Sequence, residues 1–128
     1  MSEYLVDTDV FIWYLRGNQK AYETLHAIGN FNISAATYME LIQGMRDKNE
    51  LRIFKKSIKD MKIKTIYIQE EISAKAIFYV EEFFLSHSMQ MADALIGATT
   101  STYGLKLLTA NDKHYKMLSD VEIEVFRK

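Results

Sequence analysis

Two aspartates interrupt an apolar stretch near the start of the chain. In the sequence LVDTDVF, Asp7 and Asp9 stand two residues apart among apolar side chains. A carboxylate that leaves water loses hydration free energy unless a cation or hydrogen-bond donors compensate it. Asp7 therefore indicates a functional site. For Asp9 taken alone, a place in the first turn of a helix is the simpler interpretation, because the helix dipole favours acids there.

Three further acids recur in short motifs along the chain. Glu40 lies in ISAATYMELIQG, Asp93 in MADALIGATT and Asp112 in LLTANDKHY. Each acid alone is compatible with a solvated or helix-capping role. Together they follow predicted strands, and in open parallel sheets ligands bind at the carboxyl ends of the strands. The five acids are therefore expected to converge at one edge.

Converging carboxylates repel one another and are costly to desolvate, so a hard cation is expected among them. Oxygen ligands, zero cysteines and only three histidines select Mg²⁺ or Mn²⁺. Such a cation serves reactions on phosphates, because it orients water and neutralises developing charge. The acids thus predict metal-assisted phosphate chemistry.

The composition is that of a single globular domain spanning residues 1–128. The absence of cysteine excludes disulfides and thiolate zinc sites and fits a cytoplasmic location. Three acids within the first ten residues argue against a signal peptide. Since no apolar run is long enough to cross a bilayer, no membrane association is expected.

The elements that must position the acids alternate between strands and helices. Strands are predicted at residues 3–7, 31–34, 64–68, 106–110 and 121–126, and helices at 8–17, 19–29, 35–45, 49–61, 70–87, 91–104 and 112–118. Thr8 is the expected N-cap of the first helix. This alternation predicts a three-layer α/β/α sandwich with a mostly parallel central sheet.

The charge is unevenly distributed. Residues 46–64 carry eight basic and three acidic side chains, a net charge of +5, whereas the rest of the chain carries −6. One helix face repeats basic residues at i, i+3, i+4 and i+7, namely Arg52, Lys55, Lys56 and Lys59. Such a stripe is usually a solvated face, but it also makes contact with a polyanion a candidate role.

The motifs LVDTDVFI, ISAATYMELIQG, MADALIGATT and LLTANDKHY occur in the order and near the spacing of a PIN-domain ribonuclease. The chain most resembles VapC-type toxins of bacterial and archaeal toxin–antitoxin pairs, and the resemblance covers nearly its whole length. It implies a PIN-like fold with a catalytic and metal-binding acidic quartet, Asp7, Glu40, Asp93 and Asp112. It also implies supporting roles for Thr8, Thr109 and Asn111. Many such toxins carry asparagine at the position of Asp9, so Asp9 is either an added metal ligand or a helix cap.

The resemblance further implies a Mg²⁺- or Mn²⁺-dependent endoribonuclease that hydrolyses RNA phosphodiesters to 5′-phosphate and 3′-hydroxyl ends. The implied partners are an RNA substrate, a cognate antitoxin and a second copy of the chain, within a toxin–antitoxin hetero-oligomer. The basic stripe then becomes a candidate for contacts with RNA phosphates.

Two other functions stay open at this point. DTDVF also resembles the motif of haloacid-dehalogenase-type phosphatases, with Asp7 as nucleophile, Asp9 as acid and Ser34 as a phosphate-binding hydroxyl. That family needs a further acid pair after a late strand, and LLTAND supplies one acid. A non-catalytic PIN-like binding module is the other alternative, although the intact acid set argues against it. His87 and His114 are interpreted as packing or surface residues.

Overall fold

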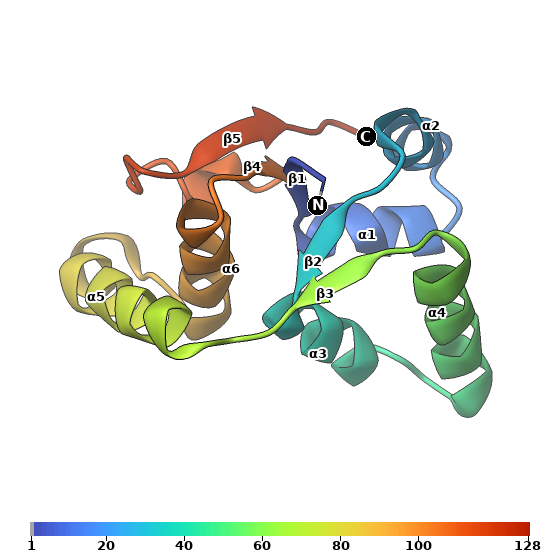
Figure 1. Cartoon of the computed structure of the whole chain (residues 1–128), viewed down its shortest axis with the longest axis horizontal. Coiled ribbons are helices and arrows are strands. Elements are labelled where there is room, and N and C mark those ends of the chain that lie inside the picture. The colour runs from blue at the N-terminus through green and yellow to red at the C-terminus, as the bar shows by residue number, and fades with distance from the viewer. Residues whose placement is uncertain (1) are drawn as a thin grey trace.

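The central sheet has five strands, all parallel, in the order β3–β2–β1–β4–β5 in the computed structural model, which describes residues 2–128. The strands are β1 (Tyr4–Val6), β2 (Asn32–Ser34), β3 (Lys64–Ile66), β4 (Lys106–Thr109) and β5 (Glu122–Val125). The chain runs outward from β1 to β3 and then returns to the other side of β1 as β4 (Figure 1). The order of the strands therefore reverses between β1 and β4.

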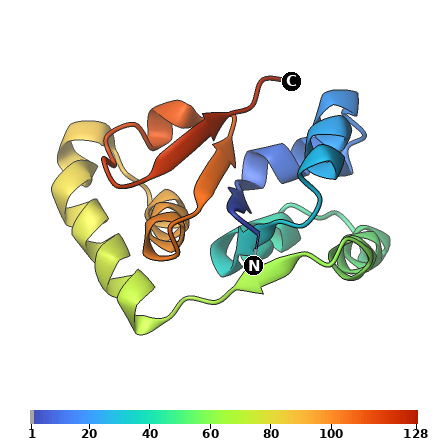
Figure 2. The ribbon, with the colours of Figure 1, turned by 45° about the horizontal axis from the view of Figure 1, so that its top comes forward.

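Helices cover both faces of the sheet, as the alternating pattern predicts (Figure 1). The helices are α1 (Thr8–Leu15), α2 (Gln19–Ile28), α3 (Ala35–Gln43), α4 (Lys48–Asp60), α5 (Glu70–His87), α6 (Met91–Thr102) and the short η1 (Asp112–His114). Helix α5 packs on the outer side of α6 (Figure 2). The α/β/α prediction is thus confirmed. No helix within residues 2–128 combines the length and the apolar character that a bilayer crossing needs.

Alternation along the strands divides the core into two clusters. Leu5 and Leu107 belong to the cluster formed with α5 and α6, whereas Val6 and Leu108 belong to the cluster formed with α1, α2 and α4. Successive side chains of a strand point to opposite faces, so a sheet covered on both sides needs apolar residues at every position. The short apolar runs before Asp7 and Asp112 have this origin.

Two local predictions are wrong. The N-cap of α1 is Asp7 and not Thr8, since the Asp7 carboxylate accepts a hydrogen bond from the Thr8 N–H at 2.8 Å. Residues 112–118 form only the single 3₁₀ turn η1 and no longer helix. The reason is Tyr115, whose side chain is fully buried beside α6 and ends the turn by packing into the core.

Candidate active site

Asp7 lies at the carboxyl edge of the sheet, where the strand order reverses. It follows β1 directly, and β1 pairs with β4, which ends at Thr109. The Asp7 side chain is only 4% exposed. Its Oδ1 accepts the Thr8 N–H, and its Oδ2 accepts the Thr109 hydroxyl at 2.8 Å. Two donors thus fix this carboxylate in one orientation.

Asp9 joins the start of α1 to the turn that follows β4. Its Oδ1 accepts the N–H of Val10 at 2.7 Å, and its Oδ2 accepts the N–H of Ala110 at 3.0 Å. Burial, and after it the charge of Asp9, raises the pKa of Asp7 to about 7. Burial also raises the pKa of Asp9. The two acids therefore compete for negative charge at neutral pH.

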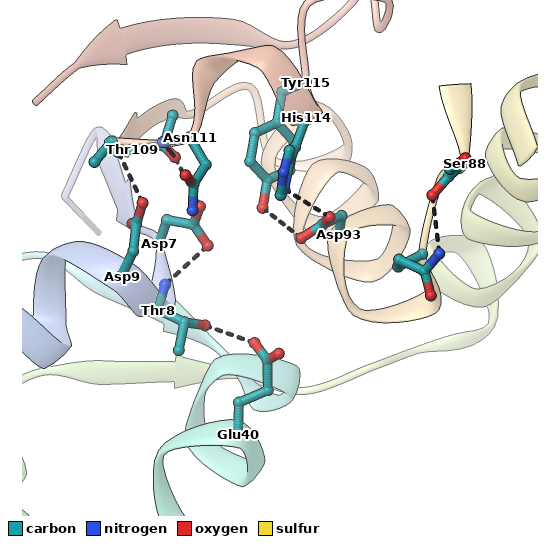
Figure 3. Close-up of polar contacts among 12 residues, drawn as sticks. Asp7, Thr8, Asp9, Glu40, Ser88, Asp93, Thr109, Asn111, His114 and Tyr115 are labelled. Atoms are coloured by element: carbon teal, nitrogen blue, oxygen red, sulfur yellow. Dashed lines mark hydrogen bonds and ion pairs between the residues drawn. The ribbon is translucent and has the colours of Figure 1, made fainter. Parts of the chain in front are cut away.

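Glu40 reaches the site from α3 through a chain of hydroxyl groups. The Thr8 hydroxyl lies 2.7 Å from Oε1 of Glu40 and 3.0 Å from the hydroxyl of Thr37 (Figure 3). Thr37 is fully buried and can donate to Thr8, while Thr8 donates to Glu40. Thr8 is thus bonded to Asp7 through its backbone and to Glu40 through its side chain.

Asp93 enters from the first turn of α6 and is held by two neighbours that the sequence analysis did not assign to the site. The Tyr115 hydroxyl donates to Oδ1 of Asp93 at 3.2 Å, and Nδ1 of His114 lies 3.1 Å from Oδ2 (Figure 3). The pKa of Tyr115 is raised well above its usual range by burial, then by the charges of Asp7 and Asp93. Tyr115 therefore lies between these two acids. The only signal for it in the sequence is its place at the end of the LLTANDKHY motif.

Asp112 is not gathered with the other acids. Its carboxylate forms ion pairs with Arg127 at 3.0 Å and with Lys116 at 3.7 Å. The hydrogen bond from Arg127 is the main cause that lowers the pKa of Asp112. The neighbouring Asn111 side chain instead points toward Asp7 (Figure 3). The structure thus links Asp7, Asp9, Glu40 and Asp93 and leaves Asp112 at the rim.

The donor set suits a hard divalent cation. Among residues 2–128 no group of three or more acids and histidines is arranged to hold a metal ion as it stands. The buried Asp7 beside Asp9 is nevertheless an unfavourable pair without a positive charge, as the raised pKa of each shows. Asp7, Glu40 and Asp93 offer carboxylate oxygens, which Mg²⁺ and Mn²⁺ prefer. These residues fit such an ion.

A parallel α/β sandwich whose carboxyl edge carries linked acids defines an α/β protein equipped for chemistry on phosphates. The family model described as PIN domain matches residues 4–120, and the chain belongs to that family. Members of this family are generally nucleases. Comparison with curated protein sequences gave no match.

Solved structures that resemble the chain support the same assignment. A toxin–antitoxin complex from Klebsiella pneumoniae has a chain 25% identical to this one, with a TM-score of 0.76, and the match covers 92% of this chain and 94% of that chain. DNA-bound VapBC from Salmonella typhimurium matches at 18% identity and a TM-score of 0.85, over 98% of both chains. VapBC2 from Rickettsia felis, bound to a promoter fragment, matches at 18% identity and a TM-score of 0.80, over 97% of this chain and 98% of that chain. The resemblance stated from the four motifs is confirmed.

We predict that the metal-free protein loses stability as the pH rises. The folded-state pKa of Asp7 is about 7, above its unfolded value of 3.8, so the folded state binds the proton more tightly. The free energy of unfolding should therefore fall between about pH 4 and pH 7, by up to about 4 kcal/mol. Asp7→Asn should remove this dependence, because its amide can donate to Thr109 and still accept from Thr8. Thermal unfolding in EDTA at pH 5 and pH 8 measures the effect.

Asp112→Asn is the matched control for this prediction. Because ion pairing lowers the pKa of Asp112, its substitution should slightly reduce stability at pH 8, the opposite sign to Asp7→Asn. A wild-type protein that is as stable as Asp7→Asn at pH 8 without metal would contradict the electrostatic picture of the site.

Proposed function

We propose that the protein is a Mg²⁺- or Mn²⁺-dependent endoribonuclease that acts as the toxin of a toxin–antitoxin pair in the cytoplasm. The observation that carries this proposal is the buried Asp7 carboxylate, placed beside Asp9 and linked to Glu40 and Asp93 by Thr8 and Tyr115. The single domain, residues 1–128, contributes all of these groups. Asp7, Glu40 and Asp93 are the proposed cation ligands, with Asp9 and Asn111 beside them.

A bound divalent cation supplies charge neutralisation at the scissile phosphate and lowers the pKa of water. The protein's own contribution is orientation. Thr8 and Thr109 hold both oxygens of Asp7, the Thr8 hydroxyl holds Glu40, and Tyr115 holds Asp93. Carboxylates fixed in this way lose little rotational freedom when substrate binds. Water then attacks phosphorus in line and the 3′ oxygen leaves, which gives a 5′-phosphate and a 3′-hydroxyl.

The phosphatase alternative loses one of its supports. Ser34 was its candidate phosphate-binding hydroxyl, but the side chain is fully buried and caps α3 by accepting the Ala36 N–H at 3.0 Å. This position leaves no hydroxyl for a phosphate beside Asp7. A binding module without activity is the remaining alternative, and a cleavage assay with pure protein distinguishes it.

The basic stripe on α4 is the proposed contact for RNA phosphates. Lys56 pairs with Asp60 and Arg52 donates to Asn49, whereas Lys55 and Lys59 form no ion pair within the described part of the chain. Free lysines release counterions when they bind a nucleic acid backbone. Lys55→Gln with Lys59→Gln should therefore weaken RNA binding equally across sequences and lower the salt slope by about 0.7 per contact.

A groove beside Glu40 is the proposed site for the antitoxin. It has a volume of about 670 Å³ and lies between α1, α3 and α4. Its lining is apolar with charged residues at its margins: Ile12, Leu15, Arg16, Glu40, Leu41, Gly44, Met45, Arg46, Glu50 and Ile53. An antitoxin segment with apolar side chains and one arginine complements this lining, since a guanidinium pairs with carboxylates such as Glu40 and Asp93. The Klebsiella structure, a toxin–antitoxin complex, supports a partner of this kind.

A second copy of the chain is the proposed partner of α5. One stripe of this helix packs inward through Ile72, Ala76 and Tyr79. A second stripe is exposed and apolar, at positions spaced i, i+1, i+7 and i+8: Ile77, Phe78, Phe84 and Leu85. Such spacing places the four side chains on one face. A two-fold axis lets one face contact its own copy, which fits a homodimer.

We predict that the cut leaves a 5′-phosphate and a 3′-hydroxyl and stops in EDTA. Mg²⁺ or Mn²⁺ should restore it, and Asp93→Asn should lower the rate by at least about a hundredfold, because an amide lacks the anionic charge that a cation needs. A single 2′-deoxy nucleotide at the scissile position should still be cut. End-labelled RNA resolved against ladders of defined termini measures this. A 2′,3′-cyclic phosphate, or cutting that persists in EDTA, would contradict the proposal and point to His114 as an acid–base group.

We predict that Ile53→Asp weakens antitoxin binding at least about tenfold, because it places a charge in the apolar part of the groove. RNA cleavage by the free protein should be retained. Tyr67→Asp is the control, because Tyr67 is exposed and lies outside the groove. Titration calorimetry with the antitoxin encoded beside this gene measures both. Equal affinity of the two variants would place the antitoxin elsewhere.

We predict that Leu85→Asp converts a homodimer into a monomer. Leu85 is 94% exposed in the single chain, so the substitution should leave the fold unchanged and act only on a contact between copies. Sedimentation velocity at micromolar concentration gives the oligomeric state. Wild-type protein that sediments as a monomer would refute a dimer formed through α5.

A further inference from the structure

Residues 126–128, which follow β5, pack across the turn between β4 and η1. The Phe126 N–H donates to the Thr109 carbonyl at 2.8 Å, and the Phe126 side chain is buried in the core cluster of α1, α2 and α4. The Lys128 ammonium lies 3.5 Å from the centre of the Trp13 ring on α1. The segment thus contacts both walls that carry the acids, α1 and the turn after β4.

Arg127 holds this turn from the outside. Its Nη1 donates to the carbonyl of Ala110 at 3.1 Å, and its Nη2 donates to Oδ1 of Asp112 at 3.0 Å. Within the same turn, the Ala110 N–H donates to Asp9, and the Asn111 N–H donates to the Thr109 hydroxyl at 2.9 Å. The peptide groups that Arg127 fixes are therefore the ones that present the turn to Asp9 and Asp7.

We propose that Arg127 and Asp112 form a clasp that positions the β4–η1 turn, and that Asp112 serves as the anchor of this clasp and not as a metal ligand. The planar guanidinium spans a backbone carbonyl and a carboxylate at once, which a lysine cannot do with one fixed geometry. With the clasp closed, the Ala110 N–H holds Asp9, and Asn111 faces Asp7. Arg127 is a positioning residue, since it contacts neither Asp7 nor Asp93. The effect on cation binding rests on the proposed function.

Hydrogen exchange of the Ala110 amide tests the clasp in the metal-free protein. Arg127→Gln should speed this exchange by about three- to tenfold, because the turn loses its outer hydrogen bonds. Asp112→Asn should have the same effect, and the double variant should add little, because both substitutions break one contact. Lys116→Gln is the matched control, since Lys116 also pairs with Asp112 but has no hydrogen bond to the turn's backbone. Its Ala110 exchange should equal that of the wild type.

Mn²⁺ titration of the same variants separates a clasp from a masked ligand. The clasp predicts that Arg127→Gln and Asp112→Asn weaken Mn²⁺ binding by similar factors, about tenfold, as expected for groups that orient ligands without touching the ion. Tighter Mn²⁺ binding by Arg127→Gln, with loss in Asp112→Asn, would overturn the proposal and make Asp112 a ligand that Arg127 covers.

Unchanged Ala110 exchange in Arg127→Gln would also overturn the proposal. The exchange measurement needs neither metal nor RNA, so it decides on the clasp even if the wild type binds no Mn²⁺. That last result would instead remove the proposed metal site. Failure of the clasp and failure of the proposed function are thus distinguishable.

Discussion

The buried carboxylate of Asp7 is the constraint on which the rest of the site depends. It sits where β1 ends, next to β4, at the point where the strand order reverses. Burial and the charge of Asp9 raise its pKa to about 7, so the folded chain holds an acid in an environment that disfavours its charge. That cost is tolerated because the Thr8 N–H and the Thr109 hydroxyl bind both oxygens. A structure built for stability alone has no reason to keep such a group.

Hydroxyl groups link the acids that surround Asp7. Thr8 connects it to Glu40 on α3, and Tyr115 lies between it and Asp93 on α6. Each link crosses from one secondary-structure element to another, so the position of every carboxylate depends on the packing of the two cores. The same principle extends outward to Arg127, which reaches the turn after β4 from beyond the last strand. The site is thus held by partners distant in sequence.

The surfaces around the site divide the proposed interactions among separate elements. The groove beside Glu40 is apolar with acids at its margins, the outer stripe of α5 is apolar, and the exposed face of α4 is basic. These properties suit an antitoxin segment, a second copy and an RNA backbone respectively. Because the three surfaces lie on different elements, single substitutions can affect one interaction and leave the others intact.

The sequence by itself determined the alternation of elements, the parallel sheet and the placement of Asp7, Glu40 and Asp93, because apolar periodicity and strand-end acids are local patterns. It did not reveal that Asp7 caps α1, that Tyr115 joins two acids, or that Asp112 pairs with Arg127. Those facts depend on which side chains meet across the fold. Spacing places Asn111 and Asp112 equally well in the turn, and only the packed core, which buries Tyr115, decides which of the two faces the site.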